Sequence, residues 1–232
     1  ITGGGRGIGA AIAAAYRAEG AEVALIDLNP ATCTATAARL GCHSVVADLA
    51  DADAARAATQ KAIDLLGGVD LLVNNAGILR FAPLLDITVA DWDLSFNVNV
   101  RAMLLTTQVA APLMPSGGAI INMASIGGKV GSPLQAHYAA SKAAVIALTR
   151  VSAMELGPRG IRVNCICPGY VLTDMGAATR TPEMVADWSA TSPLGRCAEP
   201  GDVAAMAVFL ASDDACYCTG DAFNVDGGMV MH

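Results

Sequence analysis

The chain has 232 residues, of which 54% are hydrophobic and 15% are charged, and its formal net charge at pH 7 is -7. These values exclude an intrinsically disordered chain, and they argue against nucleic acid or an anionic membrane as a partner, because both attract clustered Lys and Arg. The apolar runs are too short to cross a bilayer and no leader segment is recognised, so we expect one domain over residues 1–232 of a soluble, cytoplasmic protein.

Strand-like and helix-like stretches alternate along the chain. Runs typical of buried parallel strands occupy residues 21–27, 69–74, 119–123 and 161–167. Stretches with helical periodicity occupy residues 9–19, 52–66, 94–111, 139–156 and 203–211. The alternation predicts the α/β class, with a single Rossmann-type, doubly wound parallel sheet flanked by helices on both faces.

The first element is a glycine-rich turn, Thr2-Gly3-Gly4-Gly5-Arg6-Gly7-Ile8-Gly9. Gly3, Gly7 and Gly9 are spaced for a tight turn, a close backbone approach to phosphate and close helix packing. A helix pattern follows from Ile8, so the N–H groups at its start are expected to face a pyrophosphate. Such a turn needs a strand before it, and we expect most of that strand to precede this sequence.

The strand at 21–27 ends in Asp27, 18 residues after Gly9. An acidic residue at about this distance is typical of a hydrogen bond to the adenosine ribose, and it repels the additional phosphate of NADP. Arg6 is the opposing signal, because a basic residue in the turn can reach toward that phosphate. We weigh Asp27 more heavily and predict NAD as the cofactor, with NADP as the alternative.

Three later residues have the chemistry of proton transfer. Tyr138 and Lys142 lie four residues apart in a helical stretch, so their side chains project from one face, and an ammonium beside the phenol would favour the phenolate. Ser125 follows the strand at 119–123, at the carboxyl end where parallel sheets place ligands. The set predicts a group that removes a hydroxyl proton while a cofactor takes the hydride.

Together these motifs resemble those of the short-chain dehydrogenase/reductase family. The matching elements besides the turn are Asn74-Asn75-Ala76-Gly77, Asn99, Ser125 at 13 residues before Tyr138, Tyr138-Ala139-Ala140-Ser141-Lys142, Pro168-Gly169 followed by Thr173, and Val225-Asp226-Gly227-Gly228. The resemblance implies an oxidoreductase acting on CH–OH groups, with Ser125, Tyr138, Lys142 and Asn99 as its catalytic residues. In the family, the lysine also binds the nicotinamide ribose, and the asparagine keeps a water beside the lysine.

The resemblance also implies where the cofactor lies. Asp48 is expected at the adenine ring, residues 75–77 along the adenosine ribose, and Thr173 at the nicotinamide amide. The predicted cofactor-binding residues are Gly3, Arg6, Gly7, Ile8, Gly9, Asp27, Asp48, Leu49, Asn75, Ala76, Gly77, Tyr138, Lys142, Pro168, Gly169, Val171 and Thr173.

The substrate is less well defined by the sequence. Residues 173–194, with Met175, Met184 and Trp188, resemble the stretch that covers the substrate in the family, and we predict a mobile lid there. Gln135 and His137 precede the tyrosine and are placed either to contact a hydroxylated substrate or to lie in a surface loop.

Three functions remain open at this point. We predict transfer of a hydride between NAD and a secondary alcohol or ketone, with a polyol or sugar as substrate. The alternative is reduction of a 3-oxoacyl thioester of acyl carrier protein. An alternative of another class is a catalytically silent, NAD-binding regulator.

The cysteines and the surface helices complete the predictions. Cys165 and Cys167 are two apart in an apolar stretch and should share one face of a strand as core thiols, and no histidine has a ligand spacing from them, so we predict no metal site. The helices at 94–111 and 139–156 resemble those that pair subunits in the family. We expect a homotetramer, with a dimer as the alternative.

Overall fold

Parallel strands form the centre of the computed structural model, which describes residues 1–175, 177 and 180–231. The strands are β1 (Ala24–Asp27), β2 (His43–Val46), β3 (Leu71–Asn74), β4 (Ala119–Met123), β5 (Arg162–Pro168) and β6 (Ala222–Val225). Two sheets are assigned, β1-β2 and β3-β4-β5-β6, and every pairing within them is parallel. In register, Ala24 lies opposite His43 and Leu71 opposite Ala119.

The first two residues bridge these two sheets. Thr2 forms an isolated parallel bridge with Ile26 of β1, and its N–H donates to the carbonyl oxygen of Val73 in β3 at 2.9 Å. The start of the chain therefore occupies the strand position between β1 and β3. The glycine turn leaves from this position, as the sequence predicts.

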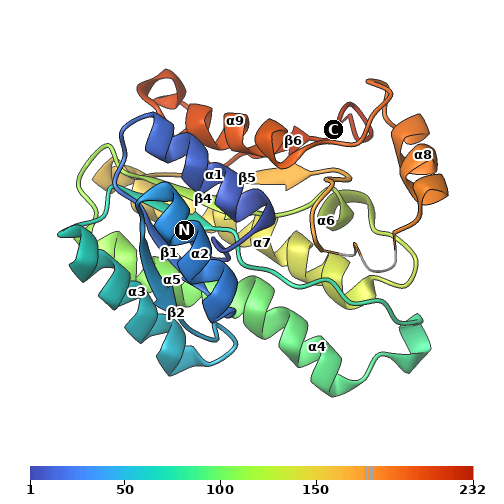
Figure 1. The fold of residues 1–232 in the computed structure, drawn as a ribbon, viewed down its shortest axis with the longest axis horizontal. Helices are drawn as coiled ribbons and strands as arrows, with labels where there is room; N and C mark the ends of the chain where they lie inside the picture. Colours follow the sequence, from blue (N-terminus) through green and yellow to red (C-terminus); the bar gives the residue numbers. More distant parts are fainter. Residues whose placement is uncertain (176, 178–179, 232) are drawn as a thin grey trace.

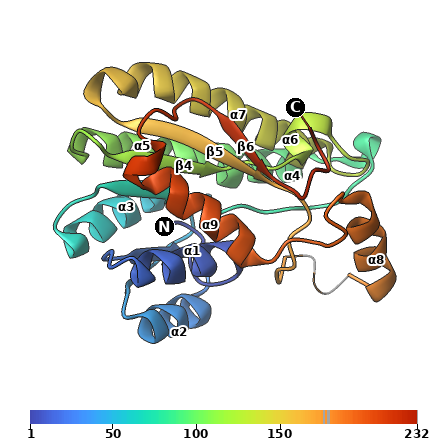
Figure 2. The ribbon, with the colours of Figure 1, turned by 90° about the horizontal axis from the view of Figure 1, so that it is seen from above.

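Helices cover both faces of the sheet (Figure 1 and Figure 2). One face carries α1 (Gly7–Ala18), α2 (Pro30–Leu40) and α9 (Pro200–Ala211), and the other carries α3 (Ala52–Leu66), α5 (Ala102–Ala110) and α7 (Ala136–Leu156). The remaining helices are α4 (Val89–Phe96), α6 (Gly127–Val130) and α8 (Pro182–Thr191). Of these, α6 and α8 lie beyond the carboxyl end of β5 (Figure 1). The doubly wound α/β fold predicted from the sequence is confirmed.

Several predicted elements differ from the observed ones. The stretch 94–111 is not one helix, because the π-helical segment Asn97–Arg101 separates α4 from α5. The short strands β2 and β6, and the helices α2, α6 and α8, were not among the predicted elements. Short 3₁₀ turns occupy Leu84–Asp86, Ala111–Leu113, Gly157–Arg159 and Asp213–Ala215.

The core follows the alternation of side chains along the central strands. In β4, Ile121 packs with Ile12 and Leu25 beneath α1 and α9, whereas its neighbour Ile120 packs with Ile63 under the opposite helices. Cys165 and Cys167 belong to one buried cluster with Val145 of α7, so they share a face of β5 as predicted. None of the described helices is both long enough and apolar enough to span a membrane.

Candidate active site

The glycine turn is fixed by hydrogen bonds to the end of β3. The Asn75 amide nitrogen donates to the carbonyl oxygens of Thr2 and Gly3, each at 3.0 Å. The Thr2 hydroxyl accepts from the N–H groups of Asn75 and Ala76, also at 3.0 Å. These four bonds join the turn to the strand-end motif, and they position the backbone that precedes α1.

Close packing in the turn requires glycine at two of the predicted positions. A Cβ on Gly9 would lie 2.2 Å from the carbonyl oxygen of Gly3, and one on Gly3, whose φ is +62°, would lie 2.8 Å from the Cα of Ala76. α1 begins at Gly7, and within the described residues the Arg6 side chain forms no capping bond there. A tight, glycine-rich turn at the start of a helix, where the first N–H groups have no partner within the helix, fits a dinucleotide pyrophosphate.

Asp27 lies at the end of β1 with its carboxylate against the turn. One oxygen accepts from the N–H of Gly5 at 2.9 Å, and the other accepts from the N–H of Asn29 at 3.0 Å. Farther along, Asp48 accepts from the N–H of Ala50 at 2.8 Å, and Leu49 is buried. The predicted ribose-binding carboxylate is therefore brought to the glycine turn.

Ser125, Tyr138 and Lys142 converge at the carboxyl end of β4. Ser125 and Tyr138 both lie next to Gly127, where an added Cβ would be 3.4 Å from Ser125 Oγ and 3.6 Å from the Tyr138 ring. Lys142 is buried, its Nζ donates to the carbonyl oxygen of Met123 at 2.7 Å, and it lies 5.7 Å from the centre of the Tyr138 ring. The structure thus brings together the serine, tyrosine and lysine that the sequence selected.

Asn99 reaches this group from the π-helical segment. Its side chain is fully buried, accepts from the N–H of Ile78 at 2.8 Å, and donates to Ser141 Oγ at 3.0 Å. A Cβ on Gly77 would lie 3.3 Å from both Asn99 Oδ1 and Lys142 Nζ, so the asparagine and the lysine border the same glycine. A π-bulge of this kind often marks a functional site, because it re-aims a side chain within a helix.

The pKa values of the tyrosine and the lysine are set mainly by burial. Burial raises the pKa of Tyr138, and the neighbouring Ser125 side chain lowers it by a smaller amount. Burial also lowers the pKa of Lys142 from 10.5 to about 8. In the protein alone the pKa of Tyr138 is therefore raised, and the lowering of this pKa by the Lys142 ammonium stays a prediction.

The lowered pKa of Lys142 predicts a change of stability with pH. The folded protein loses the lysine proton at about pH 8, whereas the unfolded chain loses it near 10.5. Between these values the unfolded chain binds more protons, so the contribution of Lys142 to the free energy of unfolding rises with pH. We measure the free energy of unfolding by urea denaturation at about pH 7 and about pH 9.5. The value for wild type minus that for Lys142→Met should be larger at the higher pH. A difference that is equal at both pH values contradicts this assignment.

The residues predicted near the nicotinamide follow β5. The carbonyl oxygen of Pro168 accepts from Ile126 N–H at 3.1 Å, and Val171 forms an isolated parallel bridge with Ala198. A Cβ on Gly7 would lie 3.4 Å from the Thr173 methyl group, so Thr173 lies against the glycine turn. The nicotinamide side of the predicted cofactor site therefore borders the glycine turn.

The mobile lid stays a prediction, whereas the structure decides the position of the histidine before the tyrosine. α8 lies within the stretch 173–194, of which residues 176, 178 and 179 fall outside the described part, and Met175 and Met184 are exposed. His137 is fully buried, and neither ring nitrogen has a hydrogen-bond partner among the described residues. The surface-loop alternative for His137 is therefore wrong, because its side chain lies inside the protein.

Comparison with known proteins covers nearly the whole chain. Residues 3–230 match the family model described as enoyl-(acyl carrier protein) reductase. The chain is 43% identical to 2-(S)-hydroxypropyl-CoM dehydrogenase 3 of Xanthobacter autotrophicus, over 99% of this chain and 94% of that relative. It is 41% identical to galactitol 2-dehydrogenase (L-tagatose-forming) of Cereibacter sphaeroides, over 100% of this chain and 94% of that relative. It is 37% identical to 3-oxoacyl-(acyl-carrier-protein) reductase of Thermotoga maritima, over 100% and 96%.

Solved structures agree with these relatives. A short-chain dehydrogenase/reductase of Brucella melitensis, described as a glucose/ribitol dehydrogenase, is 33% identical with a TM-score of 0.95, over 100% of this chain and 95% of that one. The chain belongs to the short-chain dehydrogenase/reductase family. It is therefore an oxidoreductase that uses a nicotinamide cofactor. A blue fluorescent protein from a metagenomic library, in complex with NADPH, is 40% identical with a TM-score of 0.94, over 100% of this chain and 96% of that one.

The predicted site of this short-chain dehydrogenase/reductase omits two supporting residues. Thr2 fixes residues 75 and 76. Ser141 of α7, which is buried, accepts from the Asn99 side chain at 3.0 Å and donates to the carbonyl oxygen of Tyr138 at 2.7 Å. Both lie inside motifs quoted from the sequence. Polar residues that flank a functional position within a motif are the signal that could have identified them.

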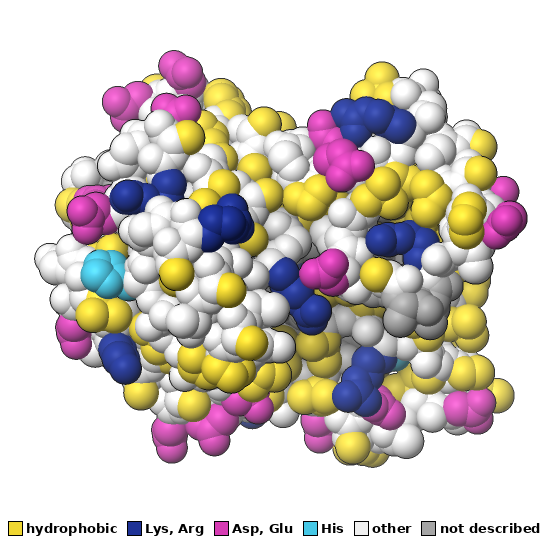
Figure 3. Space-filling view, in the orientation of Figure 1, with side chains coloured by type: hydrophobic (Ala, Val, Ile, Leu, Met, Phe, Trp, Pro, Cys, Tyr) yellow, Lys and Arg dark blue, Asp and Glu magenta, His cyan; other side chains and the backbone are white. Residues whose placement is uncertain are grey.

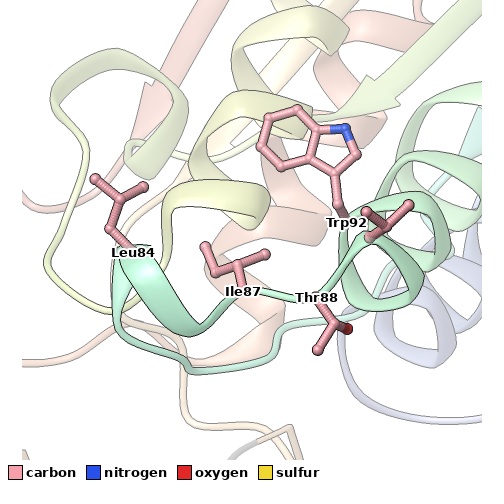
Figure 4. Close-up of a pocket in the computed structure, with 5 residues that line it drawn as sticks. Leu84, Ile87, Thr88 and Trp92 are labelled. Carbon is pink, nitrogen blue, oxygen red and sulfur yellow. The ribbon is translucent and has the colours of Figure 1, made fainter.

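The surface is hollowed between the part that carries α1 and the part that carries α8 (Figure 3). A separate hollow of about 300 Å³ lies at the start of α4, among Leu84, Ile87, Thr88, Val89 and Trp92. Its side chains are mostly apolar, and Figure 4 shows Thr88 turned away from Ile87 and Trp92. None of its lining residues belongs to the predicted site, so we do not assign the chemistry to it.

Proposed function

We propose that this enzyme transfers a hydride between NAD and a secondary alcohol or ketone, with a polyol or sugar as the alcohol. The observation that carries the proposal is that the Ser125 hydroxyl and the Tyr138 ring both border Gly127, with the buried Lys142 beside the ring at the carboxyl end of β4. This arrangement supports removal of a proton from a hydroxyl oxygen. The turn at Gly3, Gly7 and Gly9 supports a dinucleotide next to it.

Each catalytic residue has a distinct part in the proposed reaction. Ser125 donates a hydrogen bond to the substrate oxygen, and Tyr138 takes the hydroxyl proton in oxidation and returns it in reduction. Lys142 stabilises the phenolate with its charge and binds the nicotinamide ribose, while Asn99 keeps a water beside the lysine. NAD supplies the hydride acceptor when it is bound. Thr173, Asp27 and Asp48 are the side chains proposed to orient it.

The substrate class receives support from the named relatives. One of them is a galactitol dehydrogenase and another a hydroxypropyl-CoM dehydrogenase, and both names describe alcohol oxidation. A 3-oxoacyl-(acyl-carrier-protein) reductase is also among the relatives and supports the second candidate. A silent regulator has little support, since Ser125, Tyr138, Lys142 and Asn99 are all present.

A substrate panel tests these candidates. Polyols including galactitol, simple secondary alcohols, their ketones and acetoacetyl thioester are each measured with NAD and with NADP. We expect the highest kcat/KM with a polyol or sugar alcohol and NAD. A higher value for the thioester would favour the reductase, and tight NAD binding without turnover of any compound would favour the regulator.

The choice of NAD is tested at Asp27. Its carboxylate lies against the glycine turn, where it would repel a 2'-phosphate, so Asp27→Ser should lower the ratio of kcat/KM for NAD to that for NADP by about tenfold or more. Arg6→Ala should lower kcat/KM for NADP more than it lowers kcat/KM for NAD. Asp53→Ser, on α3, is the control for loss of one surface carboxylate. A wild-type preference for NADP would overturn the assignment.

We also propose a cytoplasmic homotetramer. Apolar side chains project into solvent from the two helices named for subunit pairing, at Leu104 of α5 and at Val151 and Met154 of α7. Burying them between subunits would remove this area from water. Sedimentation at micromolar concentration should give a tetramer, and a monomer would contradict the proposal.

A further inference from the structure

The motif Val225-Asp226-Gly227-Gly228 has no part in the proposed chemistry, yet it forms a highly constrained turn. The Asp226 carboxylate is buried and accepts from the N–H groups of Gly228 at 3.0 Å and Val230 at 2.8 Å. Gly227 and Gly228 have φ values of +67° and +89°, which side chains other than that of glycine rarely adopt. We call residues 225–228 the closing turn.

The closing turn contacts the chain immediately after α8. The carbonyl oxygen of Gly227 accepts from Ser192 Oγ at 3.1 Å and from Leu194 N–H at 3.3 Å. A Cβ on Gly227 would lie 2.1 Å from Ser192 Oγ, and one on Gly228 would lie 3.0 Å from Pro193. Ser192 is itself buried, so the carboxyl end of α8 is packed directly onto the turn.

The closing turn also contacts the chain before α8. Gly169 N–H donates to the carbonyl oxygen of Val225 at 3.0 Å, and a Cβ on Gly169 would lie 2.9 Å from the Cα of Asp226. The next residue, Tyr170, stacks on Trp188 of α8 with ring centres 4.6 Å apart and an angle of 6°. The same turn therefore meets both the loop that follows β5 and the end of α8.

A second set of contacts joins the chain before α8 to the chain after it. Leu172 N–H donates to the carbonyl oxygen of Ala198 at 2.9 Å, and Ala198 N–H donates to that of Tyr170 at 2.8 Å. Buried Cys197 lies 3.6 Å from Ser189 Oγ of α8. The carboxyl half of α8 is thus tied to the loop at 168–172, and the closing turn lies where the two meet.

We propose that the closing turn positions α8 over the substrate side of the site, and that Ser192 and Gly227 thereby set the affinity for the alcohol without taking part in proton transfer. This rests on the proposed function and on the prediction from the sequence that residues 173–194 cover the substrate. Ser192, Asp226 and Gly227 are positioning residues, since none is hydrogen-bonded to Ser125, Tyr138 or Lys142 in the described part of the chain.

The variant Gly227→Ala tests the contact, with Gly220→Ala as its matched control. Both glycines have positive φ, +67° and +79°, so both variants suffer the same kind of backbone strain. An added Cβ meets Ser192 Oγ at 2.1 Å in the first, but only the Ala153 Cβ at 3.4 Å in the second. The two variants differ in whether the end of α8 is displaced.

Trp188 gives a readout that needs no substrate. The chain has two tryptophans, so Trp92→Phe leaves Trp188 as the only one, stacked on Tyr170. In this background we expect Gly227→Ala to increase quenching of Trp188 fluorescence by acrylamide, and Gly220→Ala to leave it unchanged. Unchanged quenching in Gly227→Ala would overturn the proposal, whichever substrate the enzyme uses.

Kinetics provide the second readout, with the best alcohol of the panel and NAD. We expect Gly227→Ala to raise KM for the alcohol by about five- to tenfold and to change kcat by less than about twofold. Ser192→Ala removes the clashing oxygen, so Ser192→Ala/Gly227→Ala should recover much of the KM. If Gly227→Ala does not fold, Ser192→Ala alone tests the contact, because it removes the hydrogen bond to the Gly227 carbonyl oxygen and should therefore raise KM.

The outcomes separate this proposal from the proposed function. If the panel yields no alcohol substrate, the proposed function fails while the Trp188 measurement still decides whether the turn positions α8. If alcohol is oxidised but Gly227→Ala lowers kcat and leaves KM unchanged, the turn has no role in substrate affinity. Equal effects in Gly220→Ala would assign the loss to general strain and would likewise overturn the proposal.

Discussion

Replacing Tyr138 with phenylalanine should reduce kcat by about 10²–10⁴-fold, the range that positioned acid–base groups contribute. The phenyl ring can remain beside Lys142, which lies 5.7 Å from the ring centre, so only the proton-carrying hydroxyl is lost. Ser125 loses a neighbouring hydroxyl, but the glycine turn and Asp27 are untouched. NAD affinity, measured by fluorescence titration, should therefore stay within about twofold of wild type.

The control for this variant is Tyr217→Phe. Tyr217 is fully exposed, so loss of its hydroxyl should change neither kcat nor NAD affinity. Retention of most activity in Tyr138→Phe would remove the proposed mechanism. A large loss of NAD affinity with an unchanged kcat would instead make the tyrosine a cofactor contact only.

The second large effect is expected from Gly9→Ala. The added methyl group would lie 2.2 Å from the carbonyl oxygen of Gly3 and 2.6 Å from the Asn75 amide nitrogen, and real carbon atoms do not approach backbone so closely. The turn must open, which breaks the bonds that join it to β3 and moves the N–H groups away from the pyrophosphate. We expect NAD affinity to fall by about 100-fold or more.

Gly68→Ala is the matched control for Gly9→Ala. A Cβ on Gly68 meets no heavy atom within 4 Å among the described residues, so this variant adds the same methyl group without a clash. Asn75→Ala removes donors to the turn without adding atoms, and it should weaken NAD binding less than Gly9→Ala. Wild-type affinity in Gly9→Ala would show that the turn is not the pyrophosphate site.

The sequence predicted the buried centre of the fold better than its edges. The strand expected at 119–123 coincides with β4, because every residue of that strand is buried and the apolar run is continuous. β2 and β6 were not predicted because each has only four residues and most of them are partly or fully exposed, which leaves no apolar run to detect. The π-helical segment at Asn97–Arg101 has no signature in the periodicity, since the polar and apolar residues around it read as one helix.

The site was predictable where spacing determines contact. Tyr138 and Lys142 share a helix face at four residues apart, and the turn glycines follow from the close approach that each must allow. The Lys142 bond to the carbonyl of Met123 and the Asn75 bonds to the turn depend on how separate elements pack, and local pattern carries no information on that. The rise in the Tyr138 pKa could not be predicted for the same reason, because burial is a property of the whole fold.

A crystal structure with NAD and the best alcohol of the panel would test the central claim most directly. We predict the Tyr138 hydroxyl within about 2.6–3.2 Å of the alcohol oxygen, with the Lys142 ammonium near the ribose and the carbon that loses hydride facing the nicotinamide. A tyrosine hydroxyl turned out of the cleft, with Lys142 beyond its reach while NAD is bound, would contradict the account.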